Sequence, residues 1–409
     1  MRRASVVVPS LFLLALAFLS PPSLGAPSAN NKKSKHWVGT WASSPQLADS
    51  TEQHVPGFVD CTLRQIIHVS VGGAKIRVRL SNAFGKTALT IASVHVAKAA
   101  ANGAIQPASD TPLTFDEQSS VTIPSGALVY SDPVNFDLAS LSDLAVTIYV
   151  RNPPDGITAH NGSRTTSYFT SGEAVSATIL PSVQSVDHWY FLNGVDVESG
   201  EASAAVAVLG DSITDGRNST TNGNGRWPDD LARRLQANKH TRGVGVLNQG
   251  IGGNRLLRDG LGTNAQARFD RDILAQTGVR WLVVLEGVND IGTCKAGCDM
   301  ESLAKEIIGA YQQIITRAHS KNIRVYGATI TAFGGSSYAT PQAEQARQTV
   351  DNWIRTGGRF DAVIDFDAVT RDPNDPSRLS QQSDSGDHLH PADAGYKAMG
   401  DSIDLKLFR

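Results

Sequence analysis

The residues best suited to chemistry lie in short segments of the C-terminal half of the chain. One of them, GDSITDG, places Ser212 in a tight turn directly after the apolar run AVAVLG. A serine hydroxyl is a weak nucleophile unless a neighbouring base takes its proton. Another segment, DHLHP, supplies Asp387 three residues before His390, a spacing that lets a carboxylate hold an imidazole in the tautomer of a general base. Together these segments predict nucleophilic catalysis by Ser212, with His390 as its base.

Two further segments contain groups that can bind a developing negative charge. The glycines of NQGIGGN, which ends at Asn254, let the backbone approach a ligand and aim N–H groups at it. This segment lacks both the P-loop pattern and GxGxxG, which argues against a phosphate-binding loop. Asn289 in EGVND either satisfies a turn or donates a hydrogen bond to an oxyanion.

Simpler interpretations exist for each segment taken alone. GDSITDG is compatible with a helix N-cap, and DHLHP with a capped helix start that carries surface histidines. Carboxylate and imidazole groups also suit a hydrolytic metal, so Asp387, His388 and His390 with Asp211 form an alternative metal site. The four segments considered together favour the nucleophilic serine over these interpretations.

The rhythm of the chain from residue 201 to 409 predicts how these segments are positioned. Apolar runs alternate there with amphipathic stretches, which indicates a parallel sheet covered by helices on both faces. Ligands bind outside the carboxyl ends of such strands, where the segments above would meet. Strands are predicted at AVAVLG, VGVLN, WLVVLEG, IRVYGATI and DAVIDF, and helices at 228–237, 302–320, 341–356 and 391–406. Pro228, Pro341 and Pro391 each suit a first helical turn.

Residues 37–200 have a different pattern. Short runs such as KIRVRL and LAVTIYVR alternate apolar and polar residues between turn formers, which predicts strands with one buried face. We expect an all-β sandwich domain here.

The first 36 residues look like a leader. Arg2 and Arg3 precede an apolar stretch and then small residues, which predicts a secretory signal peptide over residues 1–26 and a disordered lead-in over 27–36. Prolines limit the apolar run to about a dozen residues, short of the roughly 20 that span a bilayer. We therefore expect an exported protein, extracellular or periplasmic, without stable membrane insertion.

Cysteine content and charge narrow the remaining possibilities. Cys294 and Cys298 are close enough to form a disulfide in an oxidising compartment, which leaves Cys61 alone. A Cx3C pair without further ligands is a poor zinc site, and no metal or cofactor is expected. The 37 basic and 39 acidic residues give a formal charge of −2 without long runs of one sign, so nucleic acid is an unexpected partner. The sequence does not indicate the oligomeric state.

In this order, the four segments resemble the SGNH, or GDSL-type, superfamily of esterases and lipases over residues 202–409. The resemblance implies an α/β fold, a flavodoxin-like three-layer α/β/α hydrolase domain with a parallel sheet. It also implies that Ser212 is the nucleophile and Asp387 and His390 complete the triad. The N–H groups of Ser212 and Gly253 and the side chain of Asn289 would form the oxyanion hole. The sequence has GVND and GDSI instead of the commoner GGND or GTND and GDSL, changes that move no functional atom.

The resemblance extends less specifically to the preceding region, where TWASSPQ and the strand content look like the sandwich of some secreted members. The sequence thus predicts a secreted serine esterase, acting on short acyl, above all acetyl, esters of carbohydrate. The alternatives are a metal-dependent hydrolase using Asp387, His388 and His390, and a carbohydrate-binding protein with a decayed hydrolase domain. All five expected catalytic positions hold competent residue types, which disfavours decay.

Overall fold

The computed structural model describes residue 1 and residues 35–48, 57–294 and 297–409. The expected signal peptide, apart from its first residue, and most of the expected lead-in therefore lie outside the described residues. Residues Lys35–Arg409 form one compact unit. None of the helices in the described part of the chain is long and apolar enough to cross a membrane.

The region up to Gly200 is built from antiparallel strands, as its alternating pattern predicts. In β4, Ile76, Val78 and Leu80 are buried, with the half-exposed Arg77 between the first two. They pack in one hydrophobic cluster with residues of β3, β5 and β10, strands that belong to a different sheet. The sheet orders are β1-β15-β4-β8 with β9 beside β4, β13-β12-β3-β10-β5-β6 with β7 beside β5, and β14-β11-β2.

The strands of this all-β region have the following bounds: β1 Lys35–Ala42, β2 Gln46–Leu47, β3 Cys61–Val69, β4 Gly73–Ser81, β5 Leu89–Lys98, β6 Thr111–Pro112, β7 Val121–Ile123, β8 Leu128–Tyr130, β9 Val134–Leu138, β10 Ser142–Asn152, β11 Thr158–His160, β12 Ser167–Ser171, β13 Gln184–Val186, β14 Trp189–Tyr190 and β15 Leu192–Gly200. Short 3-10 turns cover Ala101–Gly103 and Pro107–Ser109. The first strand begins two residues before the expected start of the region at residue 37.

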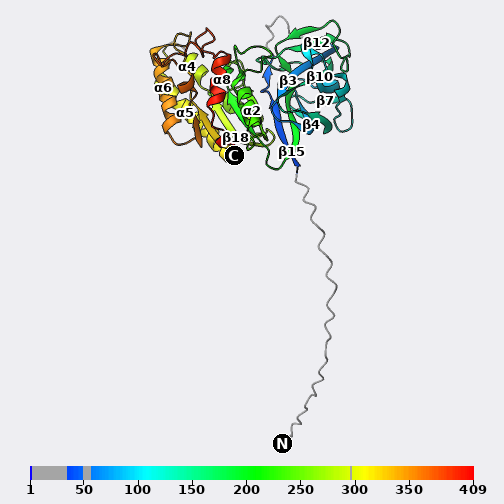
Figure 1. Ribbon diagram of the computed structural model, residues 1–409, viewed down its shortest axis with the longest axis horizontal. Helices are drawn as coiled ribbons and strands as arrows, with labels where there is room; N and C mark the ends of the chain where they lie inside the picture. The colour runs from blue at the N-terminus through cyan, green and yellow to red at the C-terminus, as the bar shows by residue number, and fades with distance from the viewer. Residues whose placement is uncertain (2–34, 49–56, 295–296) are drawn as a thin grey trace. The chain divides into compact units, whose positions relative to one another are not determined.

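A parallel sheet in the order β17-β16-β18-β19-β20 forms the centre of the C-terminal region. This is the flavodoxin-like order, so the expected α/β fold class is confirmed. The strands are β16 Ala204–Gly210, β17 Val244–Gly250, β18 Val279–Leu285, β19 Arg324–Ala328 and β20 Ala362–Ile364. Every end lies within two residues of its sequence prediction. Figure 1 shows the helices gathered around this sheet on one side of the unit and the antiparallel strands on the other.

The helices are α1 Ser212–Asp215, α2 Trp227–Ala237, α3 Ala265–Phe269 continuing as a π-helical turn over Asp270–Leu274, α4 Val288–Gly292, α5 Met300–His319, α6 Pro341–Thr356, α7 Phe366–Thr370, α8 Asp393–Ser402 and a 3-10 turn over Leu405–Phe408. The prediction for the last helix was wrong at both ends. Pro391 precedes the N-cap Ala392 and pairs with Asp384 in an isolated bridge, so it is not in the first turn. The short helices α1, α3, α4 and α7 were missed because one turn is too short to show a period.

Strand β1 and Ser70, the residue after β3, join the all-β region to the parallel sheet. The N–H of Val246, on the sheet's edge strand β17, donates to Ser70 Oγ at 2.9 Å. A Cβ atom on Gly245 would lie 2.1 Å from the carbonyl oxygen of Gly39, so this close approach requires glycine. The all-β region thus covers an edge that would otherwise expose unpaired backbone groups. The change from antiparallel to parallel strands falls between Gly200 and Ala204, and a domain boundary at 200/201 remains a proposal.

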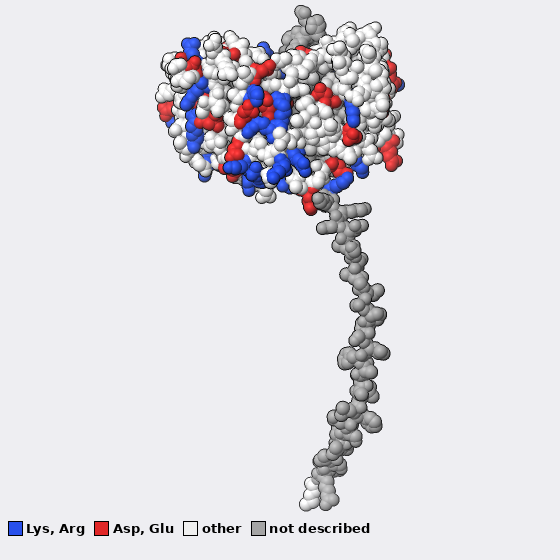
Figure 2. All heavy atoms as spheres, viewed as in Figure 1, with Lys and Arg blue, Asp and Glu red and all other residues white. Residues whose placement is uncertain are grey.

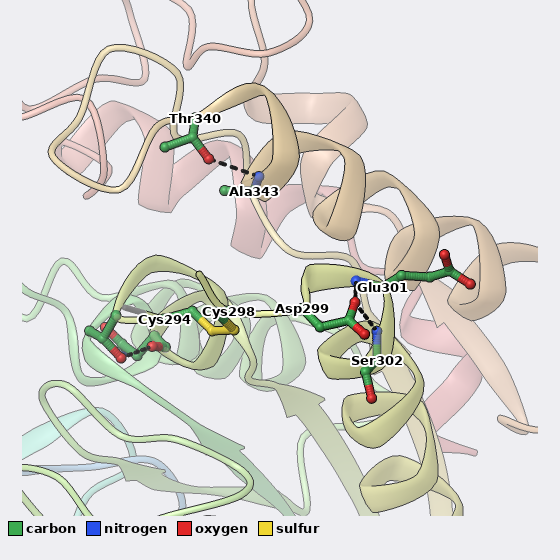
Figure 3. Close-up of a disulfide and its surroundings, with 9 residues drawn as sticks. Cys294, Cys298, Asp299, Glu301, Ser302, Thr340 and Ala343 are labelled. Carbon is green, nitrogen blue, oxygen red and sulfur yellow. Dashed lines mark hydrogen bonds between the residues drawn. A yellow bond between two sulfur atoms is a disulfide. The ribbon is translucent and has the colours of Figure 1, made fainter. Parts of the chain in front are cut away.

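The structure joins Cys294 and Cys298 in a disulfide between α4 and α5, with 5.9 Å between their Cα atoms (Figure 3). Directly after it, Asp299 caps α5 by accepting hydrogen bonds from the backbone of Glu301 and Ser302. Cys61 is buried in β3 and has no disulfide partner among the described residues. Burial, and secondarily the charge of Asp60, raises the pKa of the Cys61 thiol to about 11, so this thiol is unreactive at neutral pH.

Charged side chains of both signs are mixed over the face drawn in Figure 2. This distribution agrees with the formal net charge of −2 and with the absence of long single-sign runs in the sequence.

Candidate active site

Ser212 stands at the junction of β16 and α1, at the carboxyl edge of the parallel sheet. The strand ends at Gly210, where a Cβ atom would lie 2.1 Å from Thr214 Oγ1. Asp211 caps the helix, its Oδ1 accepting a hydrogen bond from the N–H of Ile213 at 2.8 Å. The helix-cap interpretation of GDSITDG therefore holds for Asp211, and the same tight turn presents the neighbouring Ser212 hydroxyl at the sheet edge.

His390 and Asp387 lie beside this hydroxyl. Ser212 Oγ is 2.9 Å from His390 Nε2, and His390 Nδ1 is 2.7 Å from Asp387 Oδ2. The other oxygen, Asp387 Oδ1, accepts hydrogen bonds from the backbone N–H of His390 and Leu389 at 2.8 and 3.0 Å. When Nδ1–H donates to Asp387, the lone pair of Nε2 faces the serine hydroxyl. The short spacing in DHLHP thus fixes both the ring and the backbone of His390.

Asn218 supports the carboxylate, a role that sequence reasoning missed. Its Nδ2 donates to Asp387 Oδ2 and to Ser385 Oγ, both at 2.9 Å. Asn218 lies in the loop after α1, so the segment that follows Ser212 also contacts the loop that carries Asp387 and His390. Nothing in the sequence distinguishes this asparagine from an ordinary loop residue.

Burial and hydrogen bonding tune the two titratable groups. Burial acts to raise the pKa of Asp387, but hydrogen bonds from His390 and Leu389 outweigh it and leave the pKa at about 2. Burial lowers the pKa of His390, with smaller contributions from the positive charges of Arg217 and Arg164, against the opposing effect of Asp387. The imidazole is therefore neutral, and competent as a base, at neutral pH.

The expected oxyanion donor Asn289 contacts the residue next to Gly253, the other donor expected beside Ser212. Asn289 Nδ2 donates one of its two N–H groups to the carbonyl oxygen of Asn254 at 3.0 Å. Its Oδ1 accepts a hydrogen bond from Tyr338 Oη at 3.0 Å, which fixes the orientation of the amide. Gly253 has a φ of +68°, in the left-handed region that favours glycine. No described residue accepts a hydrogen bond from the N–H of Ser212 or Gly253.

The other histidine of DHLHP points elsewhere. His388 Nδ1 is hydrogen-bonded to Asp384, and the His388 side chain is 48% exposed. Asp211, the remaining member of the alternative metal set, is buried within the serine turn, where it caps α1. Among the described residues, no group of three or more His, Cys, Asp or Glu side chains is arranged to hold a metal ion. The geometry therefore gives the metal interpretation no support.

A buried arginine, Arg268, forms hydrogen bonds with the ends of strands β16 and β17 next to the site. Arg268 donates to the carbonyl oxygens of Gly210 and Gln249 at 3.1 and 2.7 Å, and to Asn254 Oδ1 at 3.0 Å. Its guanidinium lies 3.2 Å from Asp272 Oδ2 and 3.4 Å from Glu286 Oε1, both fully buried. Burial raises the pKa of Glu286 well above its ordinary value. Burial raises the pKa of the adjacent Asp211 to about 7. Sequence reasoning missed Arg268, because an arginine in a short helix is normally solvent-exposed.

The all-β region contributes a side chain to the serine turn. His160, at the end of β11, places Nε2 2.8 Å from Asp215 Oδ1 and Nδ1 2.9 Å from the carbonyl oxygen of Ser44. Both partners of the His160–Asp215 pair are 4% exposed. Gly162 permits this contact, since a Cβ atom there would lie 1.7 Å from Asp215 Oδ2. The pair links the all-β region to the helix that begins at Ser212.

A cavity of about 510 Å³ adjoins the site and is lined by both regions. The all-β region provides Gln46, Leu47, Phe84, Asn161, Gly162 and Arg164, and the α/β region provides Asp215, Arg217, Gly252, Asp259, Gly260, Leu261, Gly262 and Thr263. Most of these residues are polar or glycine. The cavity reaches Gly252, the neighbour of the expected oxyanion donor Gly253.

Serine, histidine and aspartate linked in this order at the carboxyl edge of a parallel sheet have the arrangement of a serine hydrolase. Residues 208–398 match the model of the GDSL-like Lipase/Acylhydrolase family. Residues 208–398 are therefore a GDSL-like lipase/acylhydrolase domain, and the protein is a carboxylic ester hydrolase.

Several solved structures are similar to about half of the chain. A putative lipolytic protein of the G-D-S-L family from Desulfitobacterium hafniense is 20% identical, with a TM-score of 0.38, over 49% of this chain and 97% of that one. An acetylxylan esterase from Geobacillus stearothermophilus, solved as a catalytic mutant, is 19% identical, with a TM-score of 0.38, over 49% of this chain and 93% of that one. A carbohydrate acetylesterase from Sinorhizobium meliloti is 13% identical, with a TM-score of 0.39, over 50% of this chain and 98% of that one. No curated protein matches the sequence significantly.

Proposed function

We propose that this protein is an exported esterase that removes short acyl groups, above all acetyl, from carbohydrate through an acyl-enzyme on Ser212. The observation that carries the proposal is the chain of contacts from Ser212 Oγ to His390 Nε2 at 2.9 Å and from His390 Nδ1 to Asp387 Oδ2 at 2.7 Å. These distances are within the range that proton transfer and ring orientation require.

The reaction has two halves. His390 Nε2 takes the proton of Ser212 Oγ as this oxygen bonds to the ester carbonyl carbon, and the negative charge on the carbonyl oxygen is bound by the N–H groups of Ser212 and Gly253 and the free N–H of Asn289. The bond to the alcohol then breaks, and His390 returns the proton to the leaving oxygen. Water next attacks the acyl carbon and loses a proton to His390. The bond from the acyl carbon to Ser212 Oγ then breaks, His390 returns the proton to this oxygen, and the carboxylic acid leaves. Asp387 stabilises the imidazolium in both halves.

The adjoining cavity supports a carbohydrate ester with a small acyl group. Of its lining residues, Leu47, Phe84 and Leu261 are the large apolar ones, and the others are polar or glycine. A long acyl chain would need a continuous apolar channel to gain the roughly 0.8 kcal/mol available per buried CH₂ group. Sugar hydroxyls instead find hydrogen-bonding partners throughout this lining.

The proposal also includes the organisation of the chain. A signal peptide over residues 1–26 and a lead-in over 27–36 would precede a sandwich domain over 37–200 and a hydrolase domain over 201–409. Export agrees with the disulfide between Cys294 and Cys298, because such bonds persist in oxidising compartments.

The test is a substrate screen with a matched variant pair. The parent should hydrolyse acetylated xylan and p-nitrophenyl acetate, with kcat/KM falling as the acyl chain of the p-nitrophenyl ester lengthens. Ser212→Ala should remove this activity. Ser302→Ala, at an exposed position on α5, serves as the control and should retain it. Substantial hydrolysis by Ser212→Ala would overturn the mechanism, and a preference for long acyl chains would overturn the substrate class.

A further inference from the structure

Two arginines without carboxylate partners face the cavity beside the site. Arg164 comes from the loop after β11 and Arg217 from the residues after α1, and both line the same cavity. Within the described residues, neither guanidinium forms an ion pair, and the Nε of Arg164 is buried without a hydrogen-bond partner. Their loops are tied together, because the N–H of Asn222 donates to the carbonyl oxygen of Arg164 at 3.0 Å. Arg164 is half-buried and Arg217 is exposed. Because half-buried guanidinium groups are normally paired, the unpartnered Nε of Arg164 indicates a missing anion.

The backbone of Arg164 also indicates a functional constraint. Its φ of +49° lies in the left-handed region, where a side chain is unfavourable and glycine is preferred. Such conformations persist where the surrounding structure holds them, and they cluster at ligand-binding positions. An arginine occupies this position although glycine would fit the backbone better.

The carboxylates in the cavity wall have other partners. Asp215 Oδ1 is paired with His160 at 2.8 Å, and its second oxygen is buried against Gly162. Asp259 Oδ1 accepts hydrogen bonds from the backbone N–H and the side-chain amide of Asn264, both at 2.8 Å. Neither carboxylate forms an ion pair with Arg164 or Arg217 among the described residues.

The arginines lie close to the reacting groups. The N–H of Arg217 donates to the carbonyl oxygen of Ser212 at 2.9 Å, so only one short helix separates the guanidinium from the nucleophile. The charges of both arginines reach His390, whose pKa they help to lower. The cavity also includes Gly252, next to the oxyanion donor Gly253. A group held by the arginines would therefore belong to the same molecule as the scissile ester.

We propose that Arg164 and Arg217 bind a carboxylate on the ester substrate, so that the preferred substrates are acidic esters such as acetylated uronic-acid sugars. Guanidinium groups suit this task because they stay charged and donate paired N–H groups to a carboxylate. The carboxylate belongs either to the sugar that leaves or to the acyl part. This inference rests on the proposed esterase function and adds the charge of its substrate.

The test compares substrates that differ only in this carboxylate. In the first arm, methyl glucuronoside and methyl glucoside acetylated at the same ring hydroxyl compete on the sugar side. In the second arm, mono-p-nitrophenyl succinate and p-nitrophenyl butyrate compete on the acyl side. The readout is the ratio of kcat/KM for the acidic substrate over the neutral one. The test variants are Arg164→Gln and Arg217→Gln, and Arg217 is exposed, so its replacement should leave the fold intact. The control is Arg359→Gln, an exposed residue at the opposite end of the sheet.

We expect the parent to prefer the acidic substrate by about tenfold or more in one arm, the size of one lost charge-assisted hydrogen bond. The arm that shows the preference identifies the side that bears the carboxylate. Arg217→Gln and Arg164→Gln should bring the ratio towards one, and Arg359→Gln should keep it. High salt should also lower the ratio, because Arg217 is exposed.

Two results would overturn the inference. One is a kcat/KM ratio of acidic to neutral substrate that is near or below one for the parent in both arms. The other is a preference for the acidic substrate that persists in both Arg164→Gln and Arg217→Gln. Failure of the esterase function itself is recognised separately, since Ser212→Ala would then leave hydrolysis of the neutral substrates unchanged. Hydrolysis that depends on Ser212 but shows no charge preference refutes the carboxylate site and leaves the esterase proposal standing.

Discussion

Replacing Asn289 by alanine removes the side-chain donor of the expected oxyanion hole without touching the triad. In the structure, one N–H of this amide is used by the carbonyl oxygen of Asn254, so a single N–H remains for the substrate. Loss of one preorganised donor costs about 2.7–4 kcal/mol in the transition state, or about 10²–10³-fold in kcat. KM should change little, because the charge on the oxygen develops only as the reaction proceeds.

Tyr338→Phe provides the graded comparison. It removes the hydrogen bond to Asn289 Oδ1 but keeps the donor, so the amide loses orientation and not its N–H group. A neutral hydrogen bond contributes about 0.5–1.5 kcal/mol, which corresponds to a roughly two- to twelvefold loss of kcat. Steady-state hydrolysis of p-nitrophenyl acetate measures both variants, with thermal unfolding to verify that each remains folded. Unchanged kcat in Asn289→Ala, or a larger loss in Tyr338→Phe than in Asn289→Ala, would refute this account of the oxyanion hole.

Three further predictions follow from the same geometry. His390→Ala should abolish nearly all esterase activity, and combining it with Ser212→Ala should lower the activity little further. His388→Ala should keep its activity within about tenfold of the parent. An inactive His388→Ala variant beside an active His390→Ala variant would show that His388 is the base. Because His390 must be neutral to act as a base and its pKa is lowered, kcat/KM should fall on acidification only below the ordinary histidine pKa of about 6.5. Arg217→Gln removes a positive charge that lowers this pKa, so the fall in kcat/KM should move to higher pH. A fall that moves to lower pH in Arg217→Gln would contradict this prediction. A fragment of residues 202–409 should aggregate, because it exposes the edge of β17 and the apolar surface under Val38 and Ala42; a monomeric fragment as stable as the whole would show that the sandwich is an independent module.

Much of the fold was predictable because the two regions have different hydrophobic periods. The buried strands of the parallel sheet are continuous apolar runs, and their positions follow directly from the sequence. The convergence of Ser212 with Asp387 and His390 was also predictable, since parallel strands end at one edge. The structure brings these residues together, and their catalytic roles remain predictions.

The contacts that hold the site were not predictable, because they join residues far apart in the sequence. His160 reaches Asp215 from the all-β region, and Arg268 is buried against three segments at once. No local pattern distinguishes these side chains from exposed ones. The prediction that Pro391 lies in a first helical turn was wrong for a related reason: Pro391 pairs with Asp384, seven residues earlier, and α8 begins only after it.

The central claim is that Ser212 is a nucleophile activated by His390. Its most direct test is intact-protein and peptide mass spectrometry after treatment with a serine-directed phosphonate ester, on the parent and on His390→Ala. The account predicts a single adduct on the peptide that contains Ser212 in the parent, formed far more slowly in His390→Ala and unaffected by a chelator. An unmodified Ser212 in an enzyme that is active on p-nitrophenyl acetate, or activity that a chelator removes, would contradict it.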